Sequence, residues 1–281
     1  MKTIRVIPRL DIKGPNLVKG IHLEGLRVLG RPSDFAKYYY ENGADELIFM
    51  DVVASLYGRN SLHDIISETA KSIFIPITVG GGLRSIEDIK SVLRAGADKV
   101  CLNTAAINNP GLIEEASKIF GSSTIVVSIE AIKESDGRYL AYTDNGREYT
   151  GVDAIEWAKK VCEAGAGEIV VTSVDREGTG EGFDHELIKR INEVVTIPVV
   201  AHGGPAHADH VVEMIEATNA DAVAVASVLH YEAIQKIDHN VSSSEGNTRF
   251  LEEKRGFHKF VPTGLSELKE RMKEKNIRVR I

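Results

Sequence analysis

The sequence predicts an α/β fold, a (β/α)8 TIM barrel built from two duplicated half-barrels. Short β-branched runs alternate with amphipathic helical stretches along the 281 residues, and this alternation is typical of parallel βα units. Eight predicted units close most simply into a barrel. An internal repeat then divides the eight units into two sets of four.

The predicted elements have readable boundaries. The eight strands are residues 4–10, 46–51, 77–79, 99–102, 124–129, 168–172, 199–201 and 222–225. Among the helices, Ser33 is expected to precede 34–42, Asp184 to precede 185–194, and Ser85 to form a capping box with Asp88. The last predicted helix covers residues 265–275.

The repeat is visible at three places. Gly43-Ala-Asp-Glu-Leu47 recurs 122 residues later as Gly165-Ala-Gly-Glu-Ile169. Ile75-Pro-Ile-Thr-Val-Gly-Gly-Gly82 recurs at the same offset as Ile197-Pro-Val-Val-Ala-His-Gly-Gly204, and Ala97-Asp-Lys-Val100 matches Ala220-Asp-Ala-Val223. Matches at nearly one offset indicate duplication of a half-barrel. A ligand on the barrel axis could therefore be bound by both halves.

Length and composition limit the class of protein. A chain of 281 residues with 43% hydrophobic residues fits one barrel domain over residues 1–281. The net charge of -7, without a long basic stripe, argues against a nucleic-acid partner. No apolar run approaches the roughly 18 residues that cross a bilayer, so we expect no membrane partner. Two cysteines in apolar runs do not suggest a disulfide framework, and a cytoplasmic location is expected.

Two predicted strands deliver a carboxylate near their C-terminal ends, where barrel active sites lie. Arg5-Val-Ile-Pro-Arg-Leu-Asp-Ile-Lys13 carries Asp11, and Thr124-Ile-Val-Val-Ser-Ile-Glu-Ala-Ile-Lys133 carries Glu130 at a matching place. Both carboxylates are expected to face one cavity. Such a pair can divide acid and base roles when the two environments separate their pKa values. The alternative for Asp11 is a residue that caps a neighbouring loop.

Each half also carries a glycine loop. A strand runs into Gly80-Gly81-Gly82 in the first half and into Gly203-Gly204 in the second. The next strand ends in Asn103-Thr104-Ala105 or in Ala226-Ser227. Backbone N–H groups of such loops can bind phosphate, although the glycines could also merely form tight turns. One loop per half at the same barrel face predicts a small-molecule substrate with a phosphate at each end.

Taken together, these residues resemble the cyclase subunit of imidazole glycerol phosphate synthase, the HisF family. The resemblance covers about residues 1–236 and 265–281, and several motifs are shared with the related sugar isomerase of histidine biosynthesis. Relative to the family, residues 238–262 form a polar insertion before the last helix, which could be a linker, a lid or a docking arm. The matching motifs are Leu10-Asp-Ile-Lys13, Val18-Lys-Gly20, Gly43-Ala-Asp-Glu-Leu47, Thr78-Val-Gly-Gly-Gly82, Gly96-Ala-Asp-Lys-Val100, Asn103-Thr-Ala-Ala106, Gly165-Ala-Gly-Glu168 and Thr172-Ser-Val-Asp-Arg176.

The resemblance implies a cyclase/lyase of histidine biosynthesis that needs no cofactor. Ammonia from a separate glutaminase subunit would cross the barrel and react with a bis-phosphorylated phosphoribulosyl formimino-carboxamide nucleotide. The products would be imidazole glycerol phosphate and an aminoimidazole carboxamide ribotide. Asp11 and Glu130 would be the acid/base pair, and Lys19 would lie on a mobile loop over the substrate. The phosphates and the rest of the substrate would be bound by Gly82, Asn103, Thr104, Thr172, Gly203, Gly204, Ala226 and Ser227.

The opposite end of the barrel carries a second implied feature. In the family an ionic ring closes the ammonia channel, and its four members correspond here to Arg5, Glu46, Lys99 and Glu168. Surface ion pairs at the bottom of the barrel are the alternative. Asp98, beside the ring, is an implied contact to the glutaminase. No metal site is expected, because no acidic or cysteine ligand completes the group of His202, His207 and His210.

Four positions depart from the family pattern, all at the active-site end. Glu130 and Glu177 stand where the family has aspartate, and Arg9 and His202 replace a small neutral residue and a serine. A shift of about 1 Å in a carboxylate can cost about 100-fold in rate. Arg9 is always charged and needs a partner, such as Glu130 or a carboxylate or phosphate of the substrate.

These departures leave two alternative functions open. One is a HisF-like paralogue that delivers ammonia to a nucleotide-linked sugar and forms an amidine in surface-polysaccharide synthesis. The other is a non-catalytic barrel that binds and activates a glutaminase.

Overall fold

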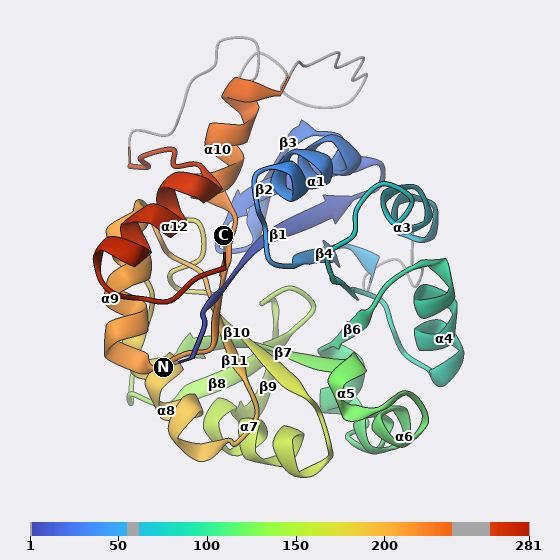
Figure 1. The fold of residues 1–281 in the computed structure, drawn as a ribbon. Helices are drawn as coiled ribbons and strands as arrows, with labels where there is room; N and C mark the ends of the chain where they lie inside the picture. Colours follow the sequence, from blue (N-terminus) through green and yellow to red (C-terminus); the bar gives the residue numbers. More distant parts are fainter. Residues whose placement is uncertain (1, 55–61, 238–258, 281) are drawn as a thin grey trace.

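A closed barrel of eight parallel strands forms the centre of the protein (Figure 1). The computed structural model describes residues 2–54, 62–237 and 259–280. Each strand pairs in parallel with the next, and β12 pairs with β1 to close the ring. The strands are β1 (Arg5–Lys13), β4 (Leu47–Asp51), β5 (Ile77–Gly80), β6 (Lys99–Leu102), β7 (Ile125–Lys133), β10 (Glu168–Ser173), β11 (Val199–His202) and β12 (Ala222–Val225).

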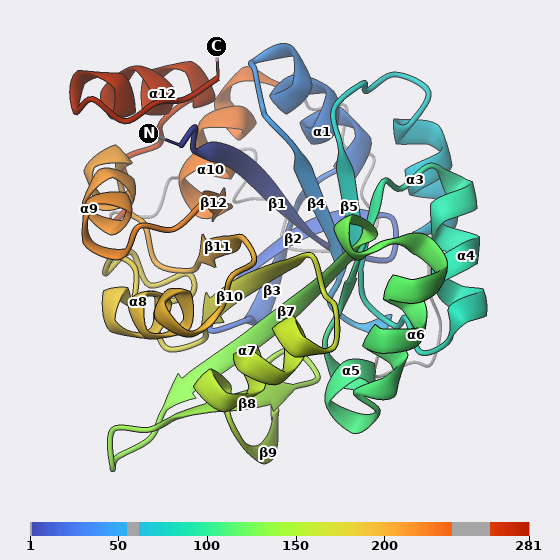
Figure 2. The same cartoon turned by 60° about the horizontal axis from the view of Figure 1, so that its bottom comes forward.

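Helices surround the barrel, as the views in Figures 1 and 2 show. They are α1 (Pro32–Glu41), α3 (His63–Thr69), α4 (Ile86–Ala95), α5 (Thr104–Asn108), α6 (Gly111–Phe120), α7 (Ala154–Glu163), α8 (His185–Val194), α9 (Ala208–Thr218), α10 (Ser227–Lys236) and α12 (Leu265–Glu274), with a 3-10 turn at Ser122–Thr124. The predicted barrel and all eight predicted strands are therefore confirmed. Most of the polar insertion predicted at 238–262 lies outside the described residues.

Local capping explains where two of the helices begin. Ser85 and Asp88 form the predicted capping box at α4, and the Asp184 carboxylate accepts from the Leu187 N–H at α8. The prediction that α1 follows Ser33 is wrong. The helix already begins at Pro32, because proline fits the first turn, where no N–H is needed.

Two antiparallel hairpins were not predicted from the sequence. The nine-residue strands β1 and β7 project beyond the barrel and pair with β2 (Asn16–Ile21) and β8 (Tyr139–Thr143), which continue into β3 (Glu24–Gly30) and β9 (Glu148–Asp153). Each half of the barrel thus opens with one long strand and a hairpin. This correspondence agrees with the duplication indicated by the sequence repeat.

The repeated Ala-Asp motif has a physical role at the N-terminal end of the barrel. The carboxylates of Asp45, Asp98 and Asp221 accept hydrogen bonds from the N–H groups of Val6 (2.7 Å), Ile77 (2.9 Å) and Val199 (3.0 Å). Each aspartate precedes one strand and binds the backbone of the neighbouring strand. The bonds satisfy backbone donors that would otherwise be lost at the strand starts, so they help to align neighbouring strands.

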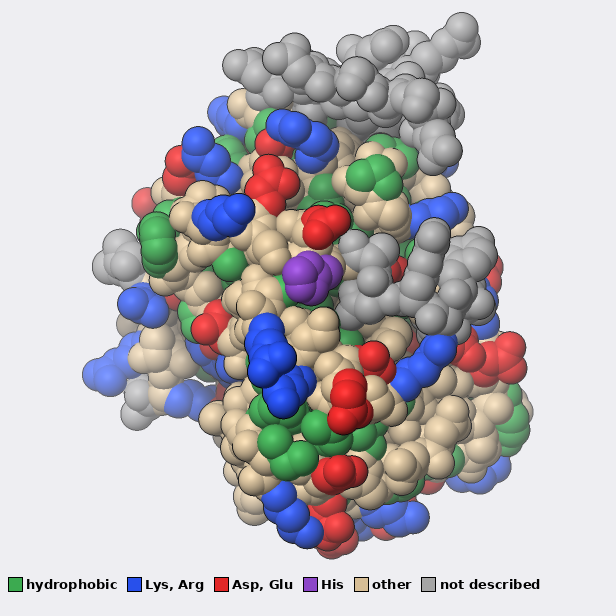
Figure 3. Space-filling model, turned by 90° about the vertical axis from the view of Figure 1, so that its right-hand side faces the viewer, with side chains coloured by type: hydrophobic (Ala, Val, Ile, Leu, Met, Phe, Trp, Pro, Cys, Tyr) green, Lys and Arg blue, Asp and Glu red, His purple; other side chains and the backbone are tan. Residues whose placement is uncertain are grey.

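The barrel interior is a packed core of its own. Inward-facing apolar side chains meet in one cluster, separate from the larger core between strands and helices; it contains Ile7, Ile48, Met50, Cys101, Val126, Val170, Val200, Ala222 and Ala224. On the outer surface shown in Figure 3, basic and acidic side chains are interspersed. Within the described ranges, no helix has both the length and the apolar character needed to span a membrane.

Gly204 provides a test of how tightly the loops at the C-terminal end are packed. Its φ is +117°, and an added Cβ would lie 2.0 Å from the Gly182 carbonyl oxygen. Gly43 also has a positive φ, of +85°, but an added Cβ there meets nothing within 4 Å. We expect Gly43→Ala to cost about 1 kcal/mol from backbone strain, and Gly204→Ala to cost about 3 kcal/mol or more because overpacking adds to it.

Urea denaturation followed through the fluorescence of Trp157, the single tryptophan, measures both costs. Equal losses of unfolding free energy in the two variants would show that the loop accommodates the added Cβ at Gly204 without a further cost.

Candidate active site

Two buried carboxylates lie near the C-terminal ends of barrel strands. Asp11 on β1 and Glu130 on β7 are each only 3% exposed. Glu130 lines a cavity of about 440 Å³ and accepts a hydrogen bond from the Gly146 N–H (2.9 Å), which comes from the turn after β8. Asp11 does not line this cavity, so the prediction that both carboxylates face one cavity is wrong, and the two have different surroundings.

The first glycine loop forms one wall of the cavity. Gly81 has a φ of +99°, and an added Cβ would lie 2.3 Å from the Asp51 carbonyl oxygen, so the close approach of these two backbones requires glycine. Asn103 is also part of the wall, and its side-chain oxygen is buried without a hydrogen-bond partner among the described residues. Four residues predicted from the sequence therefore line one cavity: Gly82, Asn103, Thr104 and Glu130.

The second glycine loop is covered. Gly203 and Gly204 follow β11, and Ala226 and Ser227 follow the adjacent strand β12; all four are buried. The loop between β10 and α8 lies over the glycines, and the Gly182 N–H donates to the Gly204 carbonyl (2.9 Å). None of the four lines the 440 Å³ cavity. The two halves thus present their glycine loops differently, one open and one closed.

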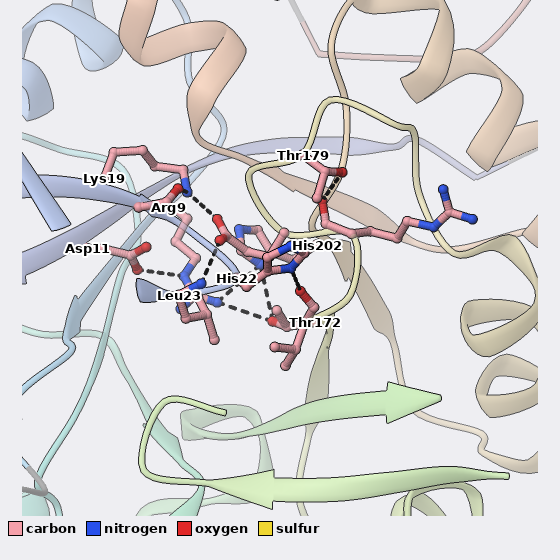
Figure 4. Close-up of polar contacts among 12 residues, drawn as sticks. Arg9, Asp11, Lys19, His22, Leu23, Thr172, Thr179 and His202 are labelled. Carbon is pink, nitrogen blue, oxygen red and sulfur yellow. Dashed lines mark hydrogen bonds and ion pairs between the residues drawn. The ribbon is translucent and has the colours of Figure 1, made fainter. Parts of the chain in front are cut away.

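Lys19 does not lie on a loop, contrary to the prediction. It belongs to strand β2, its side chain is 3% exposed, and its ammonium group forms an ion pair with Glu177. Glu177 lies in the loop between β10 and α8 and also accepts from the Leu23 N–H (3.0 Å), while its carbonyl accepts from the His22 N–H (2.9 Å). Figure 4 shows this group of contacts. The first hairpin is therefore fastened to the β10–α8 loop.

The sequence analysis identified Glu177 only as a departure from the family pattern. It did not predict the partner of this residue. The position of Glu177 in Asp175-Arg-Glu-Gly-Thr179 carried no sign that it would meet a lysine far away in the chain.

Arg9 forms the centre of a buried polar network, seen in Figure 4. Its Nε donates to Asp11 Oδ1 (2.9 Å), and its Nη1 lies 3.2 Å from both Thr172 Oγ1 and His202 Nδ1. Asp11 is therefore the direct partner of Arg9, and the hypothesis of a direct Arg9–Glu130 pair is wrong for the described structure. The structure brings together four predicted site residues from three different strands.

Burial sets the protonation behaviour of this region. It raises the pKa of the Glu130 carboxyl to about 7, against the opposing effects of Arg9 and of the Gly146 hydrogen bond. Burial, with the positive charges of Arg9 and Lys19, holds the pKa of His202 well below its ordinary value. His202 is thus neutral, whereas Glu130 can gain or lose a proton near neutral pH.

An ionic ring closes the opposite end of the barrel. Arg5 donates to Glu46 (2.7 Å) and to Glu168, and Lys99 donates to the same two carboxylates at 3.0 and 3.2 Å. Acids and bases alternate around the ring, and each charge has two partners. A cavity of about 330 Å³ outside the ring is lined by Arg5, Lys99 and Glu168 among others. Asp98 is exposed beside the ring.

The histidines noted in the sequence do not assemble a metal centre. The rings of His207 and His210 lie 3.8 Å apart, but His202 belongs to the Arg9 network. In the part of the chain that the structure describes, no group of three or more His, Cys, Asp or Glu side chains could hold a metal ion.

Comparison with known proteins places the chain in a family. The sequence pattern of the family described as "Histidine biosynthesis protein" matches residues 5–235. A Legionella pneumophila protein named "Imidazole glycerol phosphate synthase subunit HisF" is 58% identical over 204 residues, which cover 73% of this chain and 96% of that protein. Proteins of the same name from Bacillus cereus (strain Q1) and an Exiguobacterium species are 48% and 47% identical.

These two alignments cover 81% and 89% of this chain, and 90% and 98% of the relatives. The relatives are thus matched along nearly their whole length, and the resemblance derived from the motifs is confirmed. The chain belongs to the family of imidazole glycerol phosphate synthase HisF subunits.

Proposed function

We propose that this protein is the cyclase/lyase subunit of an imidazole glycerol phosphate synthase in histidine biosynthesis. It uses ammonia to convert the bis-phosphorylated phosphoribulosyl formimino-carboxamide nucleotide into imidazole glycerol phosphate and an aminoimidazole carboxamide ribotide. Beyond membership of the family, one observation carries the proposal. A buried carboxylate pair, Asp11 and Glu130, lies at one end of the barrel, and a closed ionic ring lies at the other.

The chemistry requires groups that can donate and accept protons on both sides of the reacting carbon. Ammonia must lose protons as it adds, and the leaving group must gain one as the ring closes. Glu130 suits proton exchange, because its pKa of about 7 lies near the working pH. Asp11, which is paired with Arg9, supplies the second carboxylate.

The substrate phosphates have two proposed positions. The backbone of the open loop at Gly81 and Gly82, with Asn103 and Thr104, would bind one phosphate in the 440 Å³ cavity. The second would be bound at Gly203, Gly204, Ala226 and Ser227, once the β10–α8 loop has moved from above them. Lys19, paired with Glu177 at the edge of that loop, would then be released toward the substrate.

The ammonia supply accounts for the other end of the barrel. We propose that a glutaminase subunit binds the N-terminal face, with exposed Asp98 as one contact, and that ammonia enters past Arg5, Glu46, Lys99 and Glu168. The name of the relatives describes each of them as a subunit, which supports the existence of a partner. The cytoplasmic location expected from the sequence remains a prediction.

A second candidate function is favoured by Arg9 and His202. Both are buried where the family pattern has small residues, and the second phosphate position beside them is covered. A paralogue that delivers ammonia to a nucleotide-linked sugar would need such a reshaped half-site. The third alternative, a barrel that only activates a glutaminase, is less consistent with a carboxylate pair that is complete.

Asp11→Asn tests the carboxylate pair. We expect turnover of the nucleotide to fall by about 100-fold to 10,000-fold with either nitrogen source, because an amide cannot exchange protons as a carboxylate does. Single-wavelength assays with ammonium salt at alkaline pH measure this turnover in the absence of a glutaminase subunit. Asp64→Asn, at an exposed site, is the matched control and should keep its activity. Retained turnover in Asp11→Asn would remove Asp11 from the chemistry, and absent turnover in the unaltered protein would favour the sugar acceptor.

Lys99→Ala tests the ionic ring. Opening the ring should lower glutamine-dependent turnover by about tenfold or more, while turnover with ammonium salt stays within about twofold, because only the first route uses the ring. The assay compares both nitrogen sources in the complex with a glutaminase. Lys37→Ala, on the exposed side of α1, should change neither. An equal loss from both sources would argue against a channel role.

Glu130→Gln tests the unusual acidity of Glu130. The folded pKa, about 7, is above the ordinary value of 4.5, so the protonated form stabilises the fold. This contribution is complete below about pH 4.5 and is lost as the pH rises through about 7. The unfolding free energy of the unaltered protein, minus that of Glu130→Gln, should therefore fall over this window in urea titrations. A difference that is constant with pH would contradict the raised pKa.

A further inference from the structure

Arg9 places a permanent charge inside the barrel. It lies on β1, is 1% exposed, and is the largest fully buried side chain among the described residues. Burying an ion costs several kcal/mol unless close partners replace the lost water. The surroundings of Arg9 must therefore compensate its charge, and its contacts show which side chains do so.

The guanidinium group joins side chains from three strands of the barrel. Nε binds Asp11 on the same strand, and Nη1 contacts Thr172 on β10 and His202 on β11. A guanidinium only donates, so His202 Nδ1 must accept and the ring proton lies on Nε2. Thr172 Oγ1 lies 3.1 Å from His202 Nδ1. Arg9 is thus oriented by side chains that come from three strands.

That orientation brings the charge beside Glu130. Thr172 and Glu130 are direct partners in the β10–β7 register, and adjacent strands are only about 4.8 Å apart. Arg9 therefore contacts the immediate neighbour of Glu130 while it binds Asp11. One guanidinium group thus binds Asp11 directly and acts on Glu130 through its charge, without contacting it.

Among the buried carboxylates Asp11, Glu130 and Glu177, Glu130 is the one without an ion-pair partner in the described part of the chain. Asp11 pairs with Arg9, and Glu177 pairs with Lys19. Glu130 belongs to no ion pair among the described residues and accepts only the Gly146 N–H. The charges that act on it most strongly are those of Arg9, Asp11 and Asp144, and Asp51, Cys101 and the exposed Arg84 line the same cavity. Of the buried groups in this set, Arg9 alone is positive.

We propose that Arg9 is a positioning residue for the acid/base pair: it holds Asp11 in place and supplies the fixed positive charge that lets buried Glu130 ionise. The inference rests on the proposed use of Asp11 and Glu130 in proton transfer. Without Arg9, the charges that act most strongly on Glu130 would be those of Asp11 and Asp144, and Glu130 would stay protonated to higher pH.

The test is the titration of Glu130 in the unliganded protein. Carbon-13 NMR of protein labelled at the glutamate side-chain carboxyl follows the group directly, and Glu130→Gln identifies its signal. In Arg9→Met, which keeps volume but removes charge, the midpoint should rise by about one pH unit or more, a tenfold change in proton affinity. Arg9→Gln, which can still form hydrogen bonds, is a second neutral variant and should show the same rise. Arg9→Lys keeps the charge and should largely restore the midpoint.

Lys269→Met is the matched control for the loss of a buried cation. Lys269 pairs with Asp45 at 2.9 Å near the N-terminal end of β4, away from the cavity. Its loss should lower stability without moving the Glu130 midpoint. An unchanged midpoint in the neutral Arg9 variants, or an equal rise in Lys269→Met, would overturn the proposal.

This titration requires no substrate, so it separates the two proposals. A rise in the Arg9 variants, together with no turnover of the nucleotide by the unaltered protein, would refute the proposed substrate and leave the role of Arg9 standing. Normal turnover with an unchanged midpoint would refute only the role of Arg9. In the pH profile of kcat/KM, the limb that reports the ionisation of Glu130 should also shift. The shift should be far smaller in Arg9→Lys than in Arg9→Gln.

Discussion

Charge buried inside the barrel is the constraint on which the arrangement of this site depends. Arg9, Asp11, Lys19, Glu130 and Glu177 all lie where water has little access. Such groups are tolerated only when they are paired or neutral. Two of the three carboxylates have an ion-pair partner, and the third, Glu130, meets the same constraint through its raised pKa. The proposed chemistry uses this unpaired carboxylate together with Asp11, which is paired with Arg9.

The two ends of the barrel solve the same problem differently. At the N-terminal end, Arg5, Glu46, Lys99 and Glu168 form a closed ring in which each charge has two opposite partners. At the C-terminal end the pairs are separate, and one carboxylate is free to exchange a proton. A closed ring suits a structural or gating element, whereas an unequal set of charges suits catalysis.

Duplication gives the protein two similar halves, but packing makes them unequal. Each half begins with a long strand and a hairpin, and each has a glycine loop at the same barrel face. The first hairpin is fastened to the β10–α8 loop through Lys19 and Glu177, and that loop covers Gly203 and Gly204. The first-half loop, in contrast, lines an open cavity. Substrate binding at both loops would therefore require movement mainly in the second half.

The sequence by itself determined the barrel, the eight strands and the family, because alternation of strands and helices, the repeat and the motifs are local in the chain. Through the family resemblance it also identified the members of the ionic ring, and it identified four residues of the cavity wall. Only the tertiary structure decided which charges meet: Arg9 with Asp11 and not Glu130, and Lys19 on a strand with Glu177, 158 residues away. The Lys19–Glu177 pair and the burial of Arg9 depend on closure of the barrel, which brings distant strands together, and no local pattern encodes that distance.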